Sequence, residues 1–210
     1  MRRKYRRHRK MEYHLIDDDK KKITPEMVRE AFSWIFYTII AVVIAAMFSF
    51  AFGKTVNVVG NSMEPTLNNG QTVLINRVNG YLKGTSRGDL VAFLPNGNTN
   101  LHYYIKRVVA IPGETVQIKG GILFVNGVEQ TKDAKEFDKM EDAGIASSPI
   151  KLKEDEYFVL GDSRNSSEDS RSANVGVVKA SMIIGNAWYV YGGNFENKGF
   201  IHNNYLTTTK

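Results

Sequence analysis

The chain has 210 residues, of which 42% are hydrophobic and 24% are charged, which suits one folded domain with an appended segment. It contains no cysteine, and this excludes disulfides, a thiolate metal site and a cysteine nucleophile. The four histidines stand at positions 8, 14, 102 and 202. Because a zinc site needs three or four clustered ligands, we expect no metal.

The net charge of +6 is concentrated at the N-terminus. Residues 1–30 hold eleven Lys/Arg and six Asp/Glu, a balance of +5, whereas the remaining 180 residues hold seventeen and sixteen. A basic segment of this kind can bind nucleic acid or anionic lipid. The apolar segment that follows it favours lipid, so we expect no nucleic acid partner.

Residues 31–52 form an uninterrupted uncharged segment. As a helix it would be roughly 33 Å long, enough to cross the ~30 Å hydrocarbon layer of a membrane. Trp34 and Tyr37 lie near its start, where interfacial aromatic residues are common. The alternative, a cleaved secretory signal, needs a shorter apolar segment and a small-x-small cleavage site, which the sequence FAFGKT at the exit lacks. We therefore predict a retained transmembrane helix.

The distribution of Lys and Arg predicts the direction of this helix. Eleven of them precede it, whereas Lys54 is the only one after it before Arg77. Since positive residues stay in the cytoplasm, we expect a cytoplasmic N-terminus and an extracytoplasmic domain in the cell membrane. The basic segment either binds anionic lipid, at about 1 kcal/mol per residue, or serves only as a topology signal.

The residues after the anchor predict a mainly β, antiparallel domain. Short runs rich in Val, Ile, Tyr and Phe are separated by Gly, Asn and Pro. Asn126-Gly127 between apolar residues predicts a type I′ hairpin, and the polar stretch 131–155 predicts an excursion with one short helix. The expected strands lie within 55–59, 71–78, 89–94, 101–111, 115–120, 121–130, 156–162 and 183–191.

Ser62 stands in GNSMEPTL, a turn-forming stretch directly after the first expected strand. A serine in such a turn either bonds to its own backbone or is held out as a nucleophile. A nucleophile needs a base, and His102 is the one histidine that could complete a Ser-His-Asp triad. A neutral lysine is the alternative base.

Lys106 in YYIKRVVAIPG is the candidate lysine, because it lies in a strongly apolar strand. The free pKa of lysine is about 10.4, and burial can lower it by up to 3–5 units. Strand alternation places Lys106 and Arg107 on opposite faces, so that one can be buried while the other is solvated. On this strand alone, an edge-strand lysine whose amine reaches water is the better explanation of Lys106.

The block YFVLGDSRNSSEDSR, residues 157–171, places Asp162, Arg164, Asp169 and Arg171 in one loop after an apolar strand. Such a loop can be fixed by Arg–carboxylate pairs, or it can be a solvated polar turn. Together with GNSMEPTL, RGDLVAF and YYIKRVVAIPGE, in this order, it resembles the bacterial type I signal peptidases, in the single-anchor form of Gram-positive bacteria. These enzymes are membrane-anchored Ser–Lys proteases.

The resemblance implies a role for each matching residue. Ser62 takes the position of the nucleophile and Lys106 that of the general base. Ser167 matches the serine that orients the lysine amine by a hydrogen bond. The resemblance also implies a buried ion pair between Asp169 and Arg171. Asp162 and Arg164 are implied as supporting residues of the same loop.

Two residues beside Ser62 complete the implied site. Met63 matches a residue next to the substrate groove, and we expect it to face the membrane with its apolar neighbours. Gly60 departs from the pattern, because some members carry there a serine whose hydroxyl helps to hold the oxyanion. The backbone N–H of Ser62 then remains as the donor.

The implied function is removal of signal peptides from translocated preproteins with small residues at −1 and −3, without metal or cofactor. The lipid bilayer and the secretion translocon are the other implied partners. The alternatives are a non-catalytic, membrane-anchored assembly factor and a protease with one dedicated substrate. The expected division is a tail at 1–30, a helix at 31–52, a catalytic domain at 53–192 with a β-rich insertion at roughly 119–153, and a C-terminal tail at 193–210.

Overall fold

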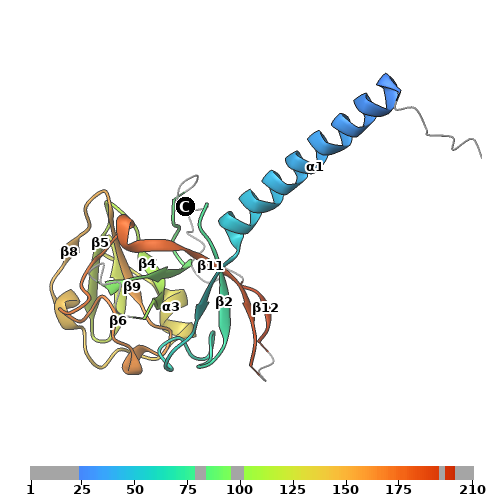
Figure 1. Cartoon of the computed structure of the whole chain (residues 1–210). Helices are drawn as coiled ribbons and strands as arrows, with labels where there is room; N and C mark the ends of the chain where they lie inside the picture. The colour runs from blue at the N-terminus through green and yellow to red at the C-terminus, as the bar shows by residue number, and fades with distance from the viewer. Residues whose placement is uncertain (1–23, 79–83, 96–101, 194–196, 202–210) are drawn as a thin grey trace, which may run out of the picture. The chain divides into compact units, whose positions relative to one another are not determined.

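The computed structural model describes residues 24–78, 84–95, 102–193 and 197–201. The first element is α1 (Pro25–Phe52), a helix of 28 residues, long and apolar enough to cross a membrane (Figure 1). It begins before the predicted position 31, because Pro25 suits the first helical position and the Thr24 hydroxyl accepts a hydrogen bond from the Met27 N–H. Most of the predicted basic tail, residues 1–23, lies outside the described residues.

The chain divides into two compact units, residues 1–43 and 44–210, and the second contains the whole β domain. Its main sheet has the strand order β1-β2-β11-β3-β4-β9-β10, with β12 beside β11, and all its ladders are antiparallel. The strands are β1 (Lys54–Asn57), β2 (Thr72–Asn76), β3 (Leu90–Phe93), β4 (Tyr104–Ala110), β9 (Glu156–Leu160), β10 (Val178–Lys179), β11 (Ile183–Tyr191) and β12 (Gly199–Phe200). The predicted fold class, an N-terminal helix followed by an antiparallel β domain, is confirmed.

A second, smaller sheet has the order β7-β6-β5-β8 and is also antiparallel. Its strands are β5 (Thr115–Lys119), β6 (Ile122–Val125), β7 (Val128–Glu129) and β8 (Ile150–Lys151). The hairpin between β6 and β7 turns at Asn126 and Gly127, with φ values of 52° and 78°, which confirms the predicted primed turn. The short helix α3 (Thr131–Glu136) follows, inside the stretch predicted as a polar excursion. The boundaries predicted for an insertion, roughly 119–153, stay a prediction.

Central strands of the main sheet are buried on both faces, which explains their nearly continuous apolar sequences. β3 and β9 are buried at every position, and β4 at every position after Tyr104. β2 alternates instead, with Val73 and Ile75 buried and their neighbours half-buried. The middle of β4, where Lys106 and Arg107 stand, is therefore enclosed by protein on both sides.

Candidate active site

A tight turn after β1 presents Ser62. The chain leaves the strand with a hydrogen bond from the Val58 N–H to the Gln71 carbonyl (2.8 Å) and reverses at Gly60, whose φ is 82°. A further turn is closed by the Leu67 N–H on the Met63 carbonyl (2.8 Å). The residues from Val58 to Leu67, here called the nucleophile turn, thereby fix the backbone on either side of Ser62.

Lys106 meets Ser62 directly, since its Nζ lies 2.6 Å from the Ser62 Oγ. The lysine projects from the middle of β4, opposite Val91 of β3, and its side chain is buried, with 4% of the residue exposed. Burial lowers the pKa of Lys106 from 10.5 to about 8, although the negative charges of Asp169 and Asp162 raise it. At pH 7.4 a pKa of about 8 leaves about 20% of the amine neutral, against about 0.1% for a free lysine.

A groove of about 330 Å³ opens beside these two side chains. His102 also lines it, but that side chain is exposed, and the hydrogen-bond partner of the Ser62 Oγ is Lys106. The geometry is therefore that of a Ser–Lys pair and not of a Ser-His-Asp triad. The groove is lined by Val58, Val59, Gly60, Asn61, Ser62, Met63, His102, Tyr103, Tyr104, Ile105, Lys106, Ser166 and Glu168.

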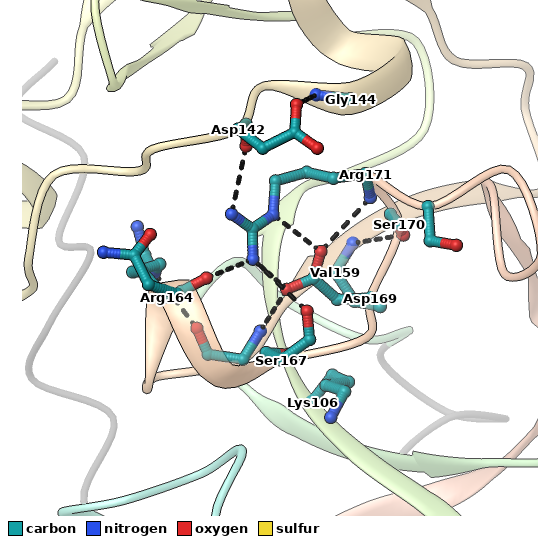
Figure 2. A network of polar contacts seen from close by, with 12 residues as sticks. Lys106, Asp142, Gly144, Val159, Arg164, Ser167, Asp169, Ser170 and Arg171 are labelled. Atoms are coloured by element: carbon teal, nitrogen blue, oxygen red, sulfur yellow. Dashed lines mark hydrogen bonds and ion pairs between the residues drawn. The ribbon is translucent and has the colours of Figure 1, made fainter.

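The loop of residues 161–171, here called the ion-pair loop, lies on the lysine side of the site. Arg171 donates from Nε to Asp169 Oδ1 and from Nη2 to Oδ2, each at 2.9 Å, so the predicted ion pair is formed (Figure 2). Asp169 also accepts a hydrogen bond from the Gly161 N–H (3.0 Å), and the Arg171 guanidinium donates to the carbonyls of Asp142 and Arg164. Each nitrogen of the Arg171 guanidinium and each oxygen of the Asp169 carboxylate thus has a partner inside the protein.

Asp162 pairs with an arginine that the sequence had not marked as part of the site. Arg107 donates to the Asp162 carboxylate from Nε at 2.8 Å and from Nη2 at 2.6 Å, and to the Gly88 carbonyl at 2.9 Å. Only 4% of Arg107 is exposed, so the expectation that one residue of the Lys106-Arg107 pair is solvated is wrong. Both can be buried because the bidentate carboxylate compensates the guanidinium charge. Asp162 was marked as a supporting residue, but its partner stands 55 positions away in the chain, so no sequence pattern indicated the pair.

Arg164 reaches out of the ion-pair loop to α3. Its two terminal nitrogens donate to the Asp133 carboxylate at 2.5 Å each, and its guanidinium carbon lies 4.3 Å from the centre of the Phe137 ring. Its Nε returns to the Gly161 carbonyl at 3.0 Å. Nothing in the polar sequence around Asp133 indicated a buried partner, so sequence reasoning missed this residue.

Ser167 is half-buried near Ser62, and its Oγ is buried but has no hydrogen-bond partner. The hydrogen bond implied between Ser167 and the Lys106 amine is therefore absent from the structure, and in Figure 2 no dashed line joins the two. The lysine amine is bonded to Ser62 instead. Ser167 lies so near Gly161 that a Cβ on that glycine would collide with its Oγ and lie 2.5 Å from the Ser62 carbonyl oxygen.

Met63 is buried, with 1% exposed, and packs in a core cluster with Val56, Val58 and Leu67. The expectation that it faces the membrane is therefore wrong. The turn after Ser62 directs the methionine inward and the serine toward the groove. Met63 does stand beside the groove, as the resemblance implied, but it borders the groove from the core side.

Gly60 has a positive φ of 82°, which disfavours other residues, while a Cβ there would meet nothing within 4 Å. Its N–H donates to Asn69 Oδ1 (3.1 Å). The glycine is thus explained by backbone conformation. In the described part of the chain no acceptor is bonded to the Ser62 N–H, and Ser62 lines the groove.

No group of three or more potential metal-ligating side chains occurs among the described residues. Three buried carboxylates near the site, Asp133, Asp162 and Asp169, are each paired with an arginine.

A family model and several known proteins match most of the chain. The family described as signal peptidase, peptidase S26, matches residues 31–191. Signal peptidase I T of Bacillus subtilis is 34% identical over 73% of this chain and 81% of its own length, and signal peptidase I S of the same species is 36% identical over 75% and 87%. Signal peptidase IB of Staphylococcus aureus is 30% identical over 76% and 88%. The chain belongs to the signal peptidase family, peptidase S26.

Proposed function

We propose that this chain, a serine endopeptidase of the signal peptidase I type, cleaves signal peptides from preproteins with Ser62 as nucleophile and Lys106 as general base. The observation that carries the assignment is the 2.6 Å contact between Lys106 Nζ and Ser62 Oγ, made by a lysine whose pKa burial lowers to about 8. A serine hydroxyl is a weak nucleophile until a neighbouring base takes its proton.

The steps follow from this pair. The neutral Lys106 amine accepts the Ser62 proton as Oγ attacks the carbonyl carbon of the scissile peptide bond. The resulting ammonium then gives that proton to the leaving amine, and an acyl ester on Ser62 remains. A water molecule, deprotonated by the same lysine, hydrolyses the ester and restores the hydroxyl. No step calls for a metal or cofactor.

The open N–H of Ser62 is the donor that the tetrahedral oxyanion needs. The substrate binds in an extended form, and β1, which is the terminal strand of the main sheet among the described residues, offers an edge on the path into the nucleophile turn. The groove between the nucleophile turn and the start of β4 is of a size that suits small substrate side chains at −1 and −3. The three arginine–carboxylate pairs have a supporting role, because they hold the ion-pair loop and β4 in place around Lys106.

The membrane arrangement belongs to the same proposal. The described part of α1 exposes apolar side chains around its length, with Ala51 its only buried residue, as a lipid-embedded helix would. The excess of Lys and Arg before it supports a cytoplasmic N-terminus. Protease added to wall-less cells should digest the β domain and spare an epitope placed before residue 24. Digestion of that epitope, with the β domain protected, would reverse the assigned direction.

Cleavage of a preprotein by the detergent-solubilised full chain tests the catalytic assignment. Wild type should release the mature protein, and Ser62→Ala should not. Ser148→Ala, which changes an exposed serine away from the groove, is the matched control and should cleave normally. Cleavage by Ser62→Ala at the wild-type rate would refute the nucleophile. Failure of the wild type on every preprotein would favour the non-catalytic alternative.

A further inference from the structure

Glu168 differs from its neighbours in the ion-pair loop because its side chain is exposed to solvent. Its neighbours Ser167 and Asp169 direct their polar atoms into the protein, whereas Glu168 is exposed and lines the groove that holds Ser62 and Lys106. It is the only carboxylate among the described residues that line this groove. Its charge therefore stands where a bound substrate must pass.

Two side chains from different parts of the fold hold this carboxylate. The Tyr104 hydroxyl, at the start of β4, donates to one Glu168 oxygen at 3.4 Å, and the Asn174 amide donates to the other at 3.3 Å. Burial and the nearby Glu168 charge raise the pKa of Tyr104, so the tyrosine stays a neutral donor at neutral pH. These two hydrogen bonds thus hold the Glu168 carboxylate at the rim of the groove.

The negative charge of Glu168 is not compensated by an ion pair in the described part of the chain. Among the described residues Glu168 forms no ion pair, in contrast to Asp162 and Asp169, which are each bonded to an arginine. Lys106 is the only lysine or arginine among the described residues that line the groove, and it is buried and bonded to Ser62. A positive group that enters with the substrate is therefore the available counter-charge.

We propose that Glu168 is a specificity-determining residue that makes the enzyme favour a preprotein with Lys or Arg, over one with Asp or Glu, at position −2. This inference rests on the proposed function. In an extended substrate, successive side chains point to opposite sides. When the small residues at −1 and −3 enter the groove, the side chain at −2 points away from its floor and toward the charged rim.

The expected size of the effect is modest, because the carboxylate is exposed. An exposed ion pair is worth 0.2–1 kcal/mol, which corresponds to about 1.4- to 5-fold in relative rate. Removing the repulsion of an acidic residue adds a change of similar size. Salt should weaken the preference, since the Debye length falls from about 10 Å at 0.1 M to about 3 Å at 1 M.

Glu168 has a second effect that the experiment must separate. Its charge also raises the pKa of Lys106, so its removal changes the proton affinity of the proposed base for every substrate alike. The ratio of kcat/KM values for two substrates at one pH is insensitive to this common change. That ratio is therefore the quantity to measure.

The test uses three preproteins that differ only in Lys, Gln or Glu at −2, cleaved by the full-length enzyme in neutral detergent. Wild type should give kcat/KM in the order Lys, Gln, Glu, with a Lys-to-Glu ratio of about 2 to 25 that shrinks at 1 M salt. Glu168→Gln should bring the ratio near 1, and Glu168→Lys should invert it. The matched control Glu154→Gln removes an equal charge from an exposed turn away from the groove and should keep the wild-type ratio.

Two results would overturn the inference: a wild-type ratio near 1 at low salt, or a ratio that Glu168→Gln leaves unchanged. Either can occur while all three preproteins are cleaved, and then the proposed function stands without the charge selectivity. Absence of cleavage of all three by wild type would instead refute the function on which the inference rests.

Discussion

The nucleophile turn and the ion-pair loop meet at Ser62, yet they are built from opposite kinds of interaction. The nucleophile turn is fixed by buried apolar side chains, Met63 and Leu67, and by backbone hydrogen bonds. The ion-pair loop is fixed by buried charges, with Arg164 and Asp169 almost entirely enclosed. The two join where the Ser163 N–H donates to the Ser62 carbonyl at 3.1 Å.

This difference separates two requirements of the chemistry. The apolar turn sets the position of the serine without adding a charge beside the lysine. The loop adds charges, and its carboxylates, Asp169 and Asp162, raise the pKa of Lys106 against the larger lowering by burial. The resulting value of about 8 leaves a useful neutral fraction and still allows the amine to be protonated when it must act as an acid.

The largest expected effect comes from removing the base on which both regions converge. Lys106→Arg keeps the positive charge but cannot deprotonate, so we expect kcat/KM to fall by about 10²- to 10⁴-fold. In wild type the acidic limb of the kcat/KM profile should lie near pH 8, the pKa of Lys106. Wild-type activity in a folded Lys106→Arg protein would contradict the mechanism.

Lys106→Met tests the same residue through stability. The folded pKa of about 8 lies below the ordinary 10.5, so the unfolded chain binds more protons between these values and wild-type stability should rise with pH in that window. Below pH 8 the buried charge costs roughly 3 kcal/mol, which Lys106→Met should recover in urea unfolding at pH 7. A mutant that is less stable than wild type at pH 7 would argue against a depressed pKa.

Disrupting an ion pair of the ion-pair loop should reduce stability and also shift the pH profile of kcat/KM. Asp169→Asn leaves Arg171 buried without its carboxylate, and we expect a loss of about 3–5 kcal/mol in urea unfolding. Because Asp169 raises the pKa of Lys106, the acidic limb should also move to lower pH. Asp133→Asn is the matched control, since it breaks the buried pair with Arg164 at the far end of the loop. Equal shifts of the limb in both variants would show that the loop acts through its conformation alone.

Disrupting the apolar packing of the nucleophile turn should reduce stability without moving the acidic limb of the kcat/KM profile. Met63→Ala removes a buried side chain and should cost roughly 2–5 kcal/mol, whereas Met63→Leu should cost less than about 1.5 kcal/mol. The pKa of Lys106, read from the pH dependence of kcat/KM, should stay within the error of wild type. A shift as large as that of Asp169→Asn would remove the distinction between the two regions.

The smallest expected effect concerns the start of the nucleophile turn. Gly60→Ala forces a side chain into a positive φ and should cost about 1–2 kcal/mol, although the space is open. Gly60→Ser carries the same strain but adds a hydroxyl near the oxyanion position. If the hydroxyl helps, Gly60→Ser should cleave faster than Gly60→Ala. Equal rates would mean that the backbone conformation alone decides this position.

The sequence predicted those parts of the fold that local patterns determine. The anchor followed from the uncharged run, the long strands from their apolar composition, and the hairpin from Asn126-Gly127. Three two-residue strands, β8, β10 and β12, were missed, because two residues are too few to show a period.

At the site, the sequence identified residue types better than their surroundings. Ser62 and Lys106 were marked, and the structure brings them into contact. The buried states of Arg107, Met63 and Asp133 were not foreseen, because each depends on a neighbour that is distant in the chain. The partner of Arg107 is Asp162, and that of Asp133 is Arg164. Burial of a charge follows from such pairing, which residue order alone does not reveal.

The burial of Met63 has a consequence for chemical durability. Susceptibility to oxidants follows exposure, and a thioether next to a nucleophile would be an easy target if it pointed to solvent. Here the sulfur-containing side chain is enclosed in the core, and the chain has no cysteine that could be oxidised. The reacting pair consists of a hydroxyl and an amine, and no sulfur atom is exposed among the described residues that line the groove. An enzyme built in this way should keep its activity in surroundings where peroxides would inactivate a thiol protease.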